Sequence, residues 1–342
     1  MICGPRNAIT DVPGLRVGNA HDAALLSGVT VLLADRPFVA AADGRGGGLG
    51  TRETDALAAA GTVDEIHAIT LSGGSAFGLS AATGVQSWLA ERGIGFAVRE
   101  ARVPIVPGAI LFDLLNGGDK DWGASPPYER LARAACDAAS ADVPCGSFGA
   151  GFGATTVNLR GGLGTASEVM ADGTVVGALA AVNPAGSVTL GRTGNFWAAP
   201  FEHSGEFGGR GWPATMPAGA LASELKGAAG ESTLLAIVAT NATLERRQAL
   251  RLAIMAQTGL ARAIYPVHTP LDGDIVFAVS TCNAPPPVPV TGLATLGAVA
   301  ANVLARAVAR GVYHAASAPP GWQGPPAWRD RHAGNASAGA TR

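Results

Sequence analysis

Mostly apolar residues gather in short runs along this chain, and turns rich in glycine separate the runs. Runs of about four to eight such residues have the length of buried β-strands. They lie at residues 27–34, 68–71, 175–182 and 275–279. A further run, residues 234–239, is unbroken and follows the polar pair Ser232 and Thr233. We therefore predict buried strands, one of which presents a hydroxyl at its first position.

Other segments place apolar residues at the spacing of an α-helix. They lie at residues 79–92, 128–139, 243–257 and 292–310. Thr243 is the expected N-cap of the third segment. Strands and helices therefore interleave, which predicts an α/β layered fold. Residues 1–316 are expected to form a single domain, because no linker or charge block divides them.

Two segments lack a regular apolar pattern. Residues 190–228 contain many Gly, Pro and aromatic residues, so we expect a long loop suited to cleavage or to a flexible lid. Residues 317–342 contain two Pro-Pro pairs and no periodicity. We expect them to form a disordered tail.

Composition narrows the classes of partner. Charged residues make up only 15% of the chain, against about 25% in a typical domain, and 48% of residues are apolar. A chain of this kind has apolar surface to cover, which favours a homo-oligomer. The net charge is −2 and there is no basic stripe, so nucleic acid is not an expected partner.

The cysteines and the first residues bear on the compartment. The four cysteines show neither a CxxC motif nor metal-ligand spacing, which indicates thiols in a reducing compartment. Residues 1–6 lack the pattern of a secretory signal, and we find no apolar run of about 18 residues that would span a membrane. The cytoplasm is the expected location. Lys120 and Lys226 are the only lysines; both lie in polar, loop-like surroundings, and neither is expected to be catalytic.

Ser232 is the first candidate for chemistry. If the chain is cut before it, the new α-amine lies beside the serine hydroxyl. A free α-amine titrates at about 7.7–8.0 and can act as a general base without a histidine. The plainer interpretation is that residues 230–233 form only a turn before a strand.

Three polar residues at other strand ends can join Ser232 in one pocket. Asn183 ends one strand and can donate a hydrogen bond to an oxyanion. Asp272 and Asp274 precede another strand and can hold a protonated amine. Two alternatives stay open here: a triad of Ser232, His268 and Asp272, and a metal site that combines His268 with the aspartates, for which the spacing is a weak signal.

Two glycine-rich loops, residues 44–50 and 72–78, match neither phosphate-binding pattern. We expect close backbone packing there. We also expect the loops to line the pocket, and we place Gly73 and Gly74 in the substrate pocket.

The chain resembles the DmpA-type aminopeptidases, which include L-aminopeptidase/D-amidase-esterases, β-peptidyl aminopeptidases and nylon-oligomer hydrolases. The resemblance runs from about residue 8 to 315. Five motifs carry it in order: residues 9–18, 50–55, 72–79, 182–184 and 268–274.

The resemblance implies an αββα sandwich of the N-terminal-nucleophile kind. It implies a chain that cuts itself into residues 1–231 and 232–342, and that assembles as a tetramer of αβ units. Ser232 matches the nucleophile, Asn183 the oxyanion donor, and Asp272 and Asp274 the supporting acidic pair. The resemblance implies no metal and no organic cofactor.

The chain departs from the family pattern at three positions. Glu231 stands before the nucleophile, where Asn or Gly is usual. Phe112 stands where several members have tyrosine, and Asn158 where some have lysine. We place Phe112 and Asn158 in the substrate pocket. The predicted function is a self-processing serine aminopeptidase or amidohydrolase that acts on short peptides or related amides. The departures favour an alternative, an unprocessed binding or scaffold protein of the same fold.

Overall fold

The computed structural model describes residues 2–58, 60–227, 231–284 and 288–332. Most of its strands join one continuous path in the order β3-β7-β4-β2-β11-β10-β9-β8, and β1 pairs with β2. The strands are β1 (Leu15–Asp22), β2 (Ser27–Gly44), β3 (Thr51–Arg52), β4 (Ile66–Ser72), β5 (Phe96–Val98), β6 (Ala101–Val103), β7 (Gly108–Ile110), β8 (Gly162–Val169), β9 (Val175–Asn183), β10 (Thr233–Ala242) and β11 (Ile275–Ala284). The α-helices are α1 (Ala81–Ala90), α2 (Tyr128–Asp137), α3 (Arg246–Ala263), α4 (Val290–Tyr313) and α5 (Trp328–His332).

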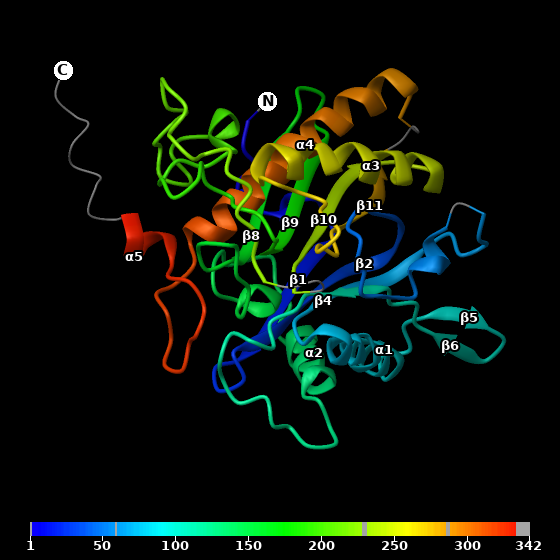
Figure 1. Cartoon of the computed structure of the whole chain (residues 1–342). Coiled ribbons are helices and arrows are strands. Elements are labelled where there is room, and N and C mark those ends of the chain that lie inside the picture. Colours follow the sequence, from blue (N-terminus) through cyan, green and yellow to red (C-terminus); the bar gives the residue numbers. More distant parts are fainter. Residues whose placement is uncertain (1, 59, 228–230, 285–287, 333–342) are drawn as a thin grey trace.

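The long strand β2 divides this path into two sheet layers. Its first part pairs with β1 and β4, and its last residues, 39–44, pair with β11. Helices α3 and α4 cover the outer face of the layer that contains β8 to β11, and α1 and α2 cover the outer face of the other (Figure 1). The αββα order that the resemblance implies is confirmed.

Alternate residues of β10 explain why its apolar run is unbroken. Leu234, Ala236 and Val238 face α3 and α4, whereas Leu235 and Ile237 lie between the two sheets. Successive side chains of a strand point to opposite faces, so a strand that is covered on both faces is apolar throughout.

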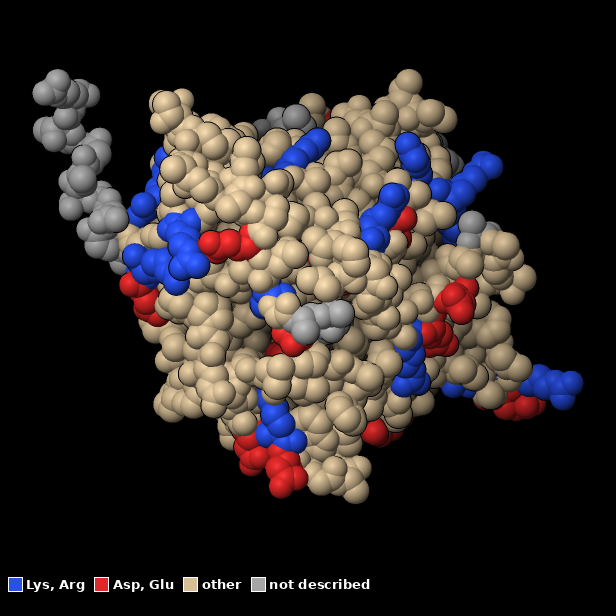
Figure 2. Space-filling view, viewed as in Figure 1, with Lys and Arg blue, Asp and Glu red and all other residues tan. Residues whose placement is uncertain are grey.

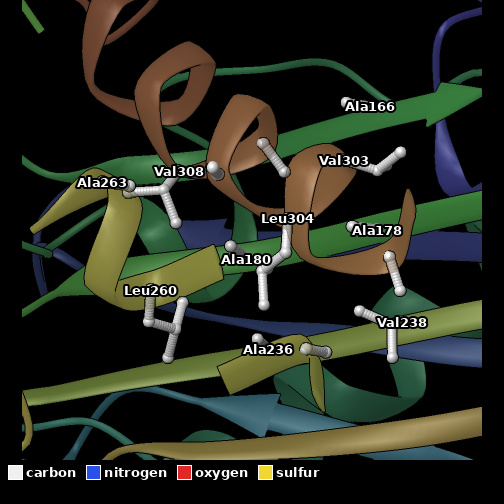
Figure 3. Packing of buried hydrophobic residues seen from close by; sticks show 14 of the residues in the cluster. Ala166, Ala178, Ala180, Ala236, Val238, Leu260, Ala263, Val303, Leu304 and Val308 are labelled. Carbon is white, nitrogen blue, oxygen red and sulfur yellow. The ribbon is translucent and has the colours of Figure 1, made fainter. Parts of the chain in front are cut away.

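Small side chains let the helices approach the sheet closely. Ala178, Ala180 and Ala236 lie on the strands beneath Leu304 of α4 and Leu260 of α3 (Figure 3). The glycines of β8 act in the same way, because a Cβ on Gly164 would lie 1.9 Å from the carbonyl oxygen of Ala307.

The helix expected at residues 243–257 is shifted. It runs from Arg246 to Ala263, and Glu245 is its N-cap, with Glu245 N donating to Gln248 Oε1 at 2.9 Å. Thr243 is therefore not the cap. The helix continues past residue 257 because Leu260 and Ala263 extend the buried face. The long loop expected at 190–228 is confirmed for residues 190–227, where only Ala199–Phe201 is helical.

The expectation of a disordered tail is wrong for residues 317–332. Arg160, which is buried, donates to the carbonyl oxygens of Ala316 and Ser317 at 2.9 Å and stacks on Trp322. Trp328 is 6% exposed and donates to Gly194 O. Aromatic anchors and one buried guanidinium thus hold a segment whose proline content suggested disorder. Residues 333–342 lie outside the described residues.

Helix α4 is long and apolar enough to cross a membrane, with a mean hydropathy of 1.5, although we expected no such run. Within the part of the chain that the structure describes, it is the one helix of that kind. Its most apolar window is 72% buried inside the protein. Packing against β8 and β9 therefore accounts for its composition.

We predict that Ile237→Ala lowers the free energy of unfolding by about 2–5 kcal/mol, because the fully buried side chain leaves a cavity between the two sheets. Ile94→Ala removes the same atoms from a side chain that is 40% exposed, so it is expected to change stability much less. Urea unfolding of both variants in a Ser232→Ala background compares chains of equal length. Equal losses would contradict the assignment of Ile237 to the inter-sheet core.

Candidate active site

Strand register brings the predicted polar residues to one end of the sheet. Thr233 at the start of β10 pairs with Asn183 at the end of β9. On the other side Ser232 forms a bridge with Asp272, and Gly273 N donates to Ser232 O at 2.9 Å. The strand ends therefore converge, as the sequence indicates, although the chemical roles of these residues stay predictions.

The Ser232 hydroxyl is buried and uncommitted. Ser232 is 1% exposed, and its Oγ has no hydrogen-bond partner among the described residues. The preceding peptide carbonyl is engaged, because Asn183 Nδ2 donates to Glu231 O at 3.4 Å. The peptide bond at which cleavage is predicted thus has an unpartnered hydroxyl on one side and a hydrogen-bond donor at its carbonyl oxygen.

Contacts to its oxygen fix the orientation of the Asn183 amide. Asn183 Oδ1 accepts hydrogen bonds from Thr155 N and from Lys226 Nζ, both at 2.9 Å. If the amide were flipped, its NH₂ group would face the N–H donors of Thr155 and Lys226. The amide nitrogen therefore faces Glu231 O, and it also donates to Phe112 O at 3.1 Å.

Lys226 lies beside Asn183 in this site, although its sequence surroundings are polar and loop-like. Its Nζ donates to Thr155 O at 2.9 Å and to Asn183 O at 3.1 Å, as well as to the Asn183 amide. Burial lowers the pKa of Lys226 to about 7, although nearby carboxylates, Asp272 first, oppose the shift. The polar residues around Lys226 indicate an exposed loop and not a buried position. The one sequence signal that distinguishes this residue is the rarity of lysine in the chain.

Asp272 and Asp274 are fully buried and hold backbone N–H groups. Asp272 accepts from Ala185 N at 2.8 Å and from Thr269 N at 2.9 Å. Asp274 Oδ1 accepts from Leu234 N at 2.8 Å, which fixes the start of β10. Burial raises the pKa of the Asp274 carboxyl, and a hydrogen bond from His268 offsets part of the rise.

The structure does not assemble the triad through His268. His268 Nδ1 lies 2.9 Å from Asp274 Oδ2, not from Asp272, whose oxygens are occupied by the contacts above. Within the described ranges, His268 forms no hydrogen bond with Ser232. The described residues also contain no group of three His, Cys, Asp or Glu that could hold a metal.

The glycine-rich loop at residues 44–50 packs closely on the aspartate turn. Gly48 N donates to Asp272 O at 2.8 Å, and a Cβ on Gly46 would lie 2.4 Å from that same oxygen. The expected close backbone packing is confirmed. The loop does not reach the cavity described next.

A cavity of about 180 Å³ opens beside the Glu231 carbonyl. Its walls come from four segments of the chain. They are Phe112, Asp113, Leu115, Asn116, Gly153, Thr155, Thr156, Val157, Lys226, Glu231, Gly324 and Pro325. The last two belong to the segment for which disorder was expected. On the face viewed in Figure 2, basic and acidic residues form small scattered clusters, and a basic and an acidic patch lie near its centre.

Only one of the four residues that the sequence places in the substrate pocket lines this cavity, namely Phe112. Gly73 and Gly74 lie behind it, where Gly74 N donates to Asp113 Oδ1 at 2.8 Å. Gly74 has a φ of +83°, and a Cβ there would lie 2.0 Å from the Tyr128 ring.

Asn158 is buried in a neighbouring loop, with Nδ2 donating to Gly191 O at 3.0 Å, and it does not line this cavity. Sequence reasoning missed Asp113, Asn116 and Thr155, because no motif distinguished them.

Comparisons with known proteins agree with this geometry. The sequence model of Peptidase family S58 matches residues 7–323. An uncharacterised aminopeptidase of Mycobacterium tuberculosis (strain ATCC 25618 / H37Rv) is 45% identical over 330 residues, which cover 90% of this chain and 94% of the relative. A 6-aminohexanoate-oligomer endohydrolase of Kocuria sp. (strain KY2) is 31% identical over 280 residues, which cover 79% and 74% of the two chains.

Among solved structures, the L-aminopeptidase D-Ala-esterase/amidase of Ochrobactrum anthropi, described as a variant of the Ntn hydrolase fold, superposes with a TM-score of 0.69. It is 23% identical, and the superposition covers 92% of this chain and 88% of that one. The layered fold is therefore of the Ntn hydrolase kind. The chain belongs to peptidase family S58 and is a hydrolase that acts on peptide or amide bonds.

Proposed function

We propose that the chain cuts itself between Glu231 and Ser232, and that Ser232 then serves as an N-terminal nucleophile toward short peptides or related amides. The hydrogen bond from Asn183 Nδ2 to Glu231 O, beside an uncommitted Ser232 hydroxyl, carries this proposal. In an Ntn hydrolase fold this arrangement supplies both the attacking atom and the donor that stabilises the oxyanion.

Self-cleavage proceeds by transfer of an acyl group within the chain. Ser232 Oγ attacks the Glu231 carbonyl carbon, and its proton passes to the departing nitrogen, which becomes the α-amine of Ser232. The C–N bond breaks as the C–O ester bond forms. Water then hydrolyses the ester, which leaves a carboxylate on Glu231 and restores the serine hydroxyl.

Turnover of a substrate repeats the same acyl transfer with an external carbonyl. The α-amine of Ser232 accepts the hydroxyl proton and later returns it to the leaving amine. Asn183 stabilises the oxyanion in both reactions. No other base is required, which agrees with the absence of a hydrogen bond between His268 and Ser232 among the described residues.

Lys226 supports Asn183 electrostatically. Below its pKa of about 7, the charged Lys226 amine at Asn183 Oδ1 draws electron density from the amide and makes Nδ2 a better donor to the oxyanion; above that pKa the neutral amine still donates a hydrogen bond that holds Asn183 in place. Lys226 does not contact the attacked carbonyl in the described contacts, so its proposed role is to position and polarise Asn183.

We predict that wild-type protein separates on a denaturing gel into pieces of about 23 and about 11 kDa, in proportion to chain length. The smaller piece should begin Ser-Thr-Leu-Leu. Ser232→Ala should stay a single chain and be inactive. Asn183→Ala should slow both cleavage and turnover by about 10²–10³-fold, the cost of removing one oxyanion donor.

Asn241→Ala is the matched control, because it removes an amide at the opposite end of β10 that does not line the cavity. A Ser232→Ala protein that is cut and active would refute the proposal. A wild-type chain that stays intact after long incubation would favour the non-catalytic binding protein, in conflict with the relatives.

We predict that His268→Asn leaves chain cleavage intact and lowers activity less than tenfold. Asparagine tolerates the left-handed backbone of residue 268, where φ is +56°, and keeps a donor for Asp274. It removes the imidazole as a base. Loss of turnover with normal cleavage would instead support catalysis through His268. Steady-state kinetics and N-terminal sequencing measure the two effects separately.

The pH dependence of stability tests Lys226. Because the pKa of Lys226 falls from 10.5 to about 7 on folding, the unfolded chain binds more protons than the folded chain between these values. The contribution of Lys226 to the free energy of unfolding therefore rises as pH increases from about 7 to 10.5.

Lys226→Met should remove this rise. Urea unfolding in a Ser232→Ala background at pH 7 and pH 9.5 measures the difference between variant and parent. A difference that is the same at both pH values would contradict the lowered pKa.

A further inference from the structure

Another cavity lies where the pairing between β2 and β4 is interrupted. Between the pairs that Ala68 and Ile66 of β4 make, residues 34–37 of β2 lie opposite His67 alone. An irregularity of this kind opens a sheet locally and changes the direction of its side chains. The cavity beside it has a volume of about 280 Å³ and shares no lining residue with the cavity at Glu231.

The wall of this cavity combines apolar and polar side chains. It is formed by the irregular part of β2, by β4, by the end of α1 and by the turn between α1 and β5 (Figure 1). Its large apolar side chains are Pro37, Leu89 and Ile94. Its titratable side chains are Asp35, Arg36 and His67. Ligand pockets usually measure about 300–1,000 Å³, so the volume suits a small ligand with both an apolar and a polar part.

His67 has one ring nitrogen that is not used by the fold. The residue is 7% exposed, on a strand whose residues are all buried. Its Nδ1 accepts a hydrogen bond from Ile105 N at 3.1 Å, so the neutral ring carries its proton on Nε2. Nε2 has no hydrogen-bond partner among the described residues, and it is not one of the unpartnered atoms that are fully enclosed. It is therefore an accessible, uncommitted donor on a residue that lines the cavity.

The protonation of His67 agrees with this assignment. Burial lowers the pKa of His67, and the Ile105 backbone opposes part of the shift. The ring is therefore neutral at neutral pH and offers a single N–H to a ligand. A bound anion would favour the charged ring and would oppose the effect of burial.

The two charged residues of the wall differ in their partners. Within the described ranges, Arg36 is exposed and has neither an ion pair nor a hydrogen bond. Asp35 is engaged, because its Oδ1 lies 3.4 Å from Nη2 of Arg16. Arg16 belongs to β1, which pairs with β2 on the edge opposite β4, since Thr30 pairs with both neighbours. The uncommitted polar groups are thus a cation and an N–H donor, and both require an anionic acceptor.

A carboxylate with a short apolar chain matches these groups. Its two oxygens can accept from the planar guanidinium of Arg36 and from Nε2 of His67, and hydrogen bonds to an ionised group are the stronger ones. Its apolar chain would pack against Leu89, Ile94 and Pro37 and leave water. An inorganic anion would satisfy the first requirement but not the second.

We propose that the cavity at His67 and Arg36 is a further binding site, for a small carboxylate with an apolar side chain. The site lies at the opposite end of β4 from Gly73 and Gly74, which lie behind the cavity at Glu231. The inference therefore does not depend on the proposed nucleophile. Hydrolysis of a peptide or amide bond releases an acid of this class, so a reaction product has the chemistry that the site binds.

Nuclear magnetic resonance of protein labelled with carbon-13 at the histidine Cε1 positions tests the site. Isovalerate is the probe, isovaleramide has the same shape without the charge, and inorganic phosphate has charge without the apolar chain. Isovalerate should shift the His67 resonance in a saturable way, and the other two should not. His21, which stacks on Phe152 and does not line the cavity, is the internal control and should not respond.

Variants of the two uncommitted residues assign the signal and the charge. His67→Asn keeps an acceptor for Ile105 N and identifies the His67 resonance by its loss. Arg36→Gln should weaken isovalerate binding about fivefold, because a charge-assisted hydrogen bond is lost. Arg251→Gln makes the same change at an exposed position of α3 that does not line the cavity, and it should have no effect. An unchanged affinity in Arg36→Gln would overturn the anion site.

A pair of surface variants covers the case in which His67→Asn does not fold. Ile94 lines the cavity and is 40% exposed, so both Ile94→Asp and Ile94→Asn are expected to fold. Ile94→Asp introduces a like charge at the rim and should weaken isovalerate binding severalfold more than Ile94→Asn at low salt. Calorimetric titration measures both affinities. Equal losses in the two variants would contradict a site for an anion.

A Ser232→Ala background separates this inference from the proposed function. Isovalerate should shift the His67 resonance there with the affinity of the wild type, whether or not Ser232 is the nucleophile. Equal responses of His67 to isovalerate and to isovaleramide would overturn the assignment of a carboxylate. No response of His67, with isovalerate acting only as an inhibitor of hydrolysis, would place the acid in the catalytic cavity and overturn the further site.

Discussion

The register between β9, β10 and β11 is the constraint on which the site depends. It sets Thr233 opposite Asn183 and Ser232 beside Asp272, although these residues are far apart in the sequence. A shift by one residue would exchange the β10 side chains that face α3 and α4 with those that lie between the sheets, and it would separate Thr233 from Asn183 and Ser232 from Asp272. The packing of these side chains against both cores therefore holds Ser232, Asn183 and the aspartate turn in place.

Within the described residues, several buried polar atoms near these strand ends have no hydrogen-bond partner. Ser232 Oγ, Asp113 Oδ2 and Asn116 Oδ1 are of this kind and lie in or next to one cavity. By contrast Asp272 and Asp274 are saturated by backbone donors. Groups that maintain the fold satisfy each other, whereas buried polar atoms without partners are the exception and call for a separate explanation.

The sequence predicts the layers, most elements and the convergence of three strand ends, because these follow from apolar periodicity and from motifs at strand boundaries. It does not predict that Lys226, Asp113 and Gly324 line the cavity. Their positions depend on how loops fold over the sheet, and loop composition carries little information about that. The N-cap at Glu245 was missed for a related reason. Its backbone N–H donates to the side chain of Gln248, and Glu245 has no side-chain hydroxyl of the kind that usually signals an N-cap. Local sequence patterns therefore predict secondary structure and its burial, but not the tertiary contacts of individual polar side chains.

The position of β10 and β11 has a consequence for the two pieces of a cut chain. Both strands belong to residues 232–342, yet they lie between β9 and β2, which belong to residues 1–231. Separated pieces would expose unpaired edges on β9, β2, β10 and β11, and such edges invite aggregation. The pieces are thus interleaved rather than docked, and mixing them after separate synthesis would require threading a strand pair into the interior of a sheet. Cutting would make a new chain end without making a new subunit that can leave.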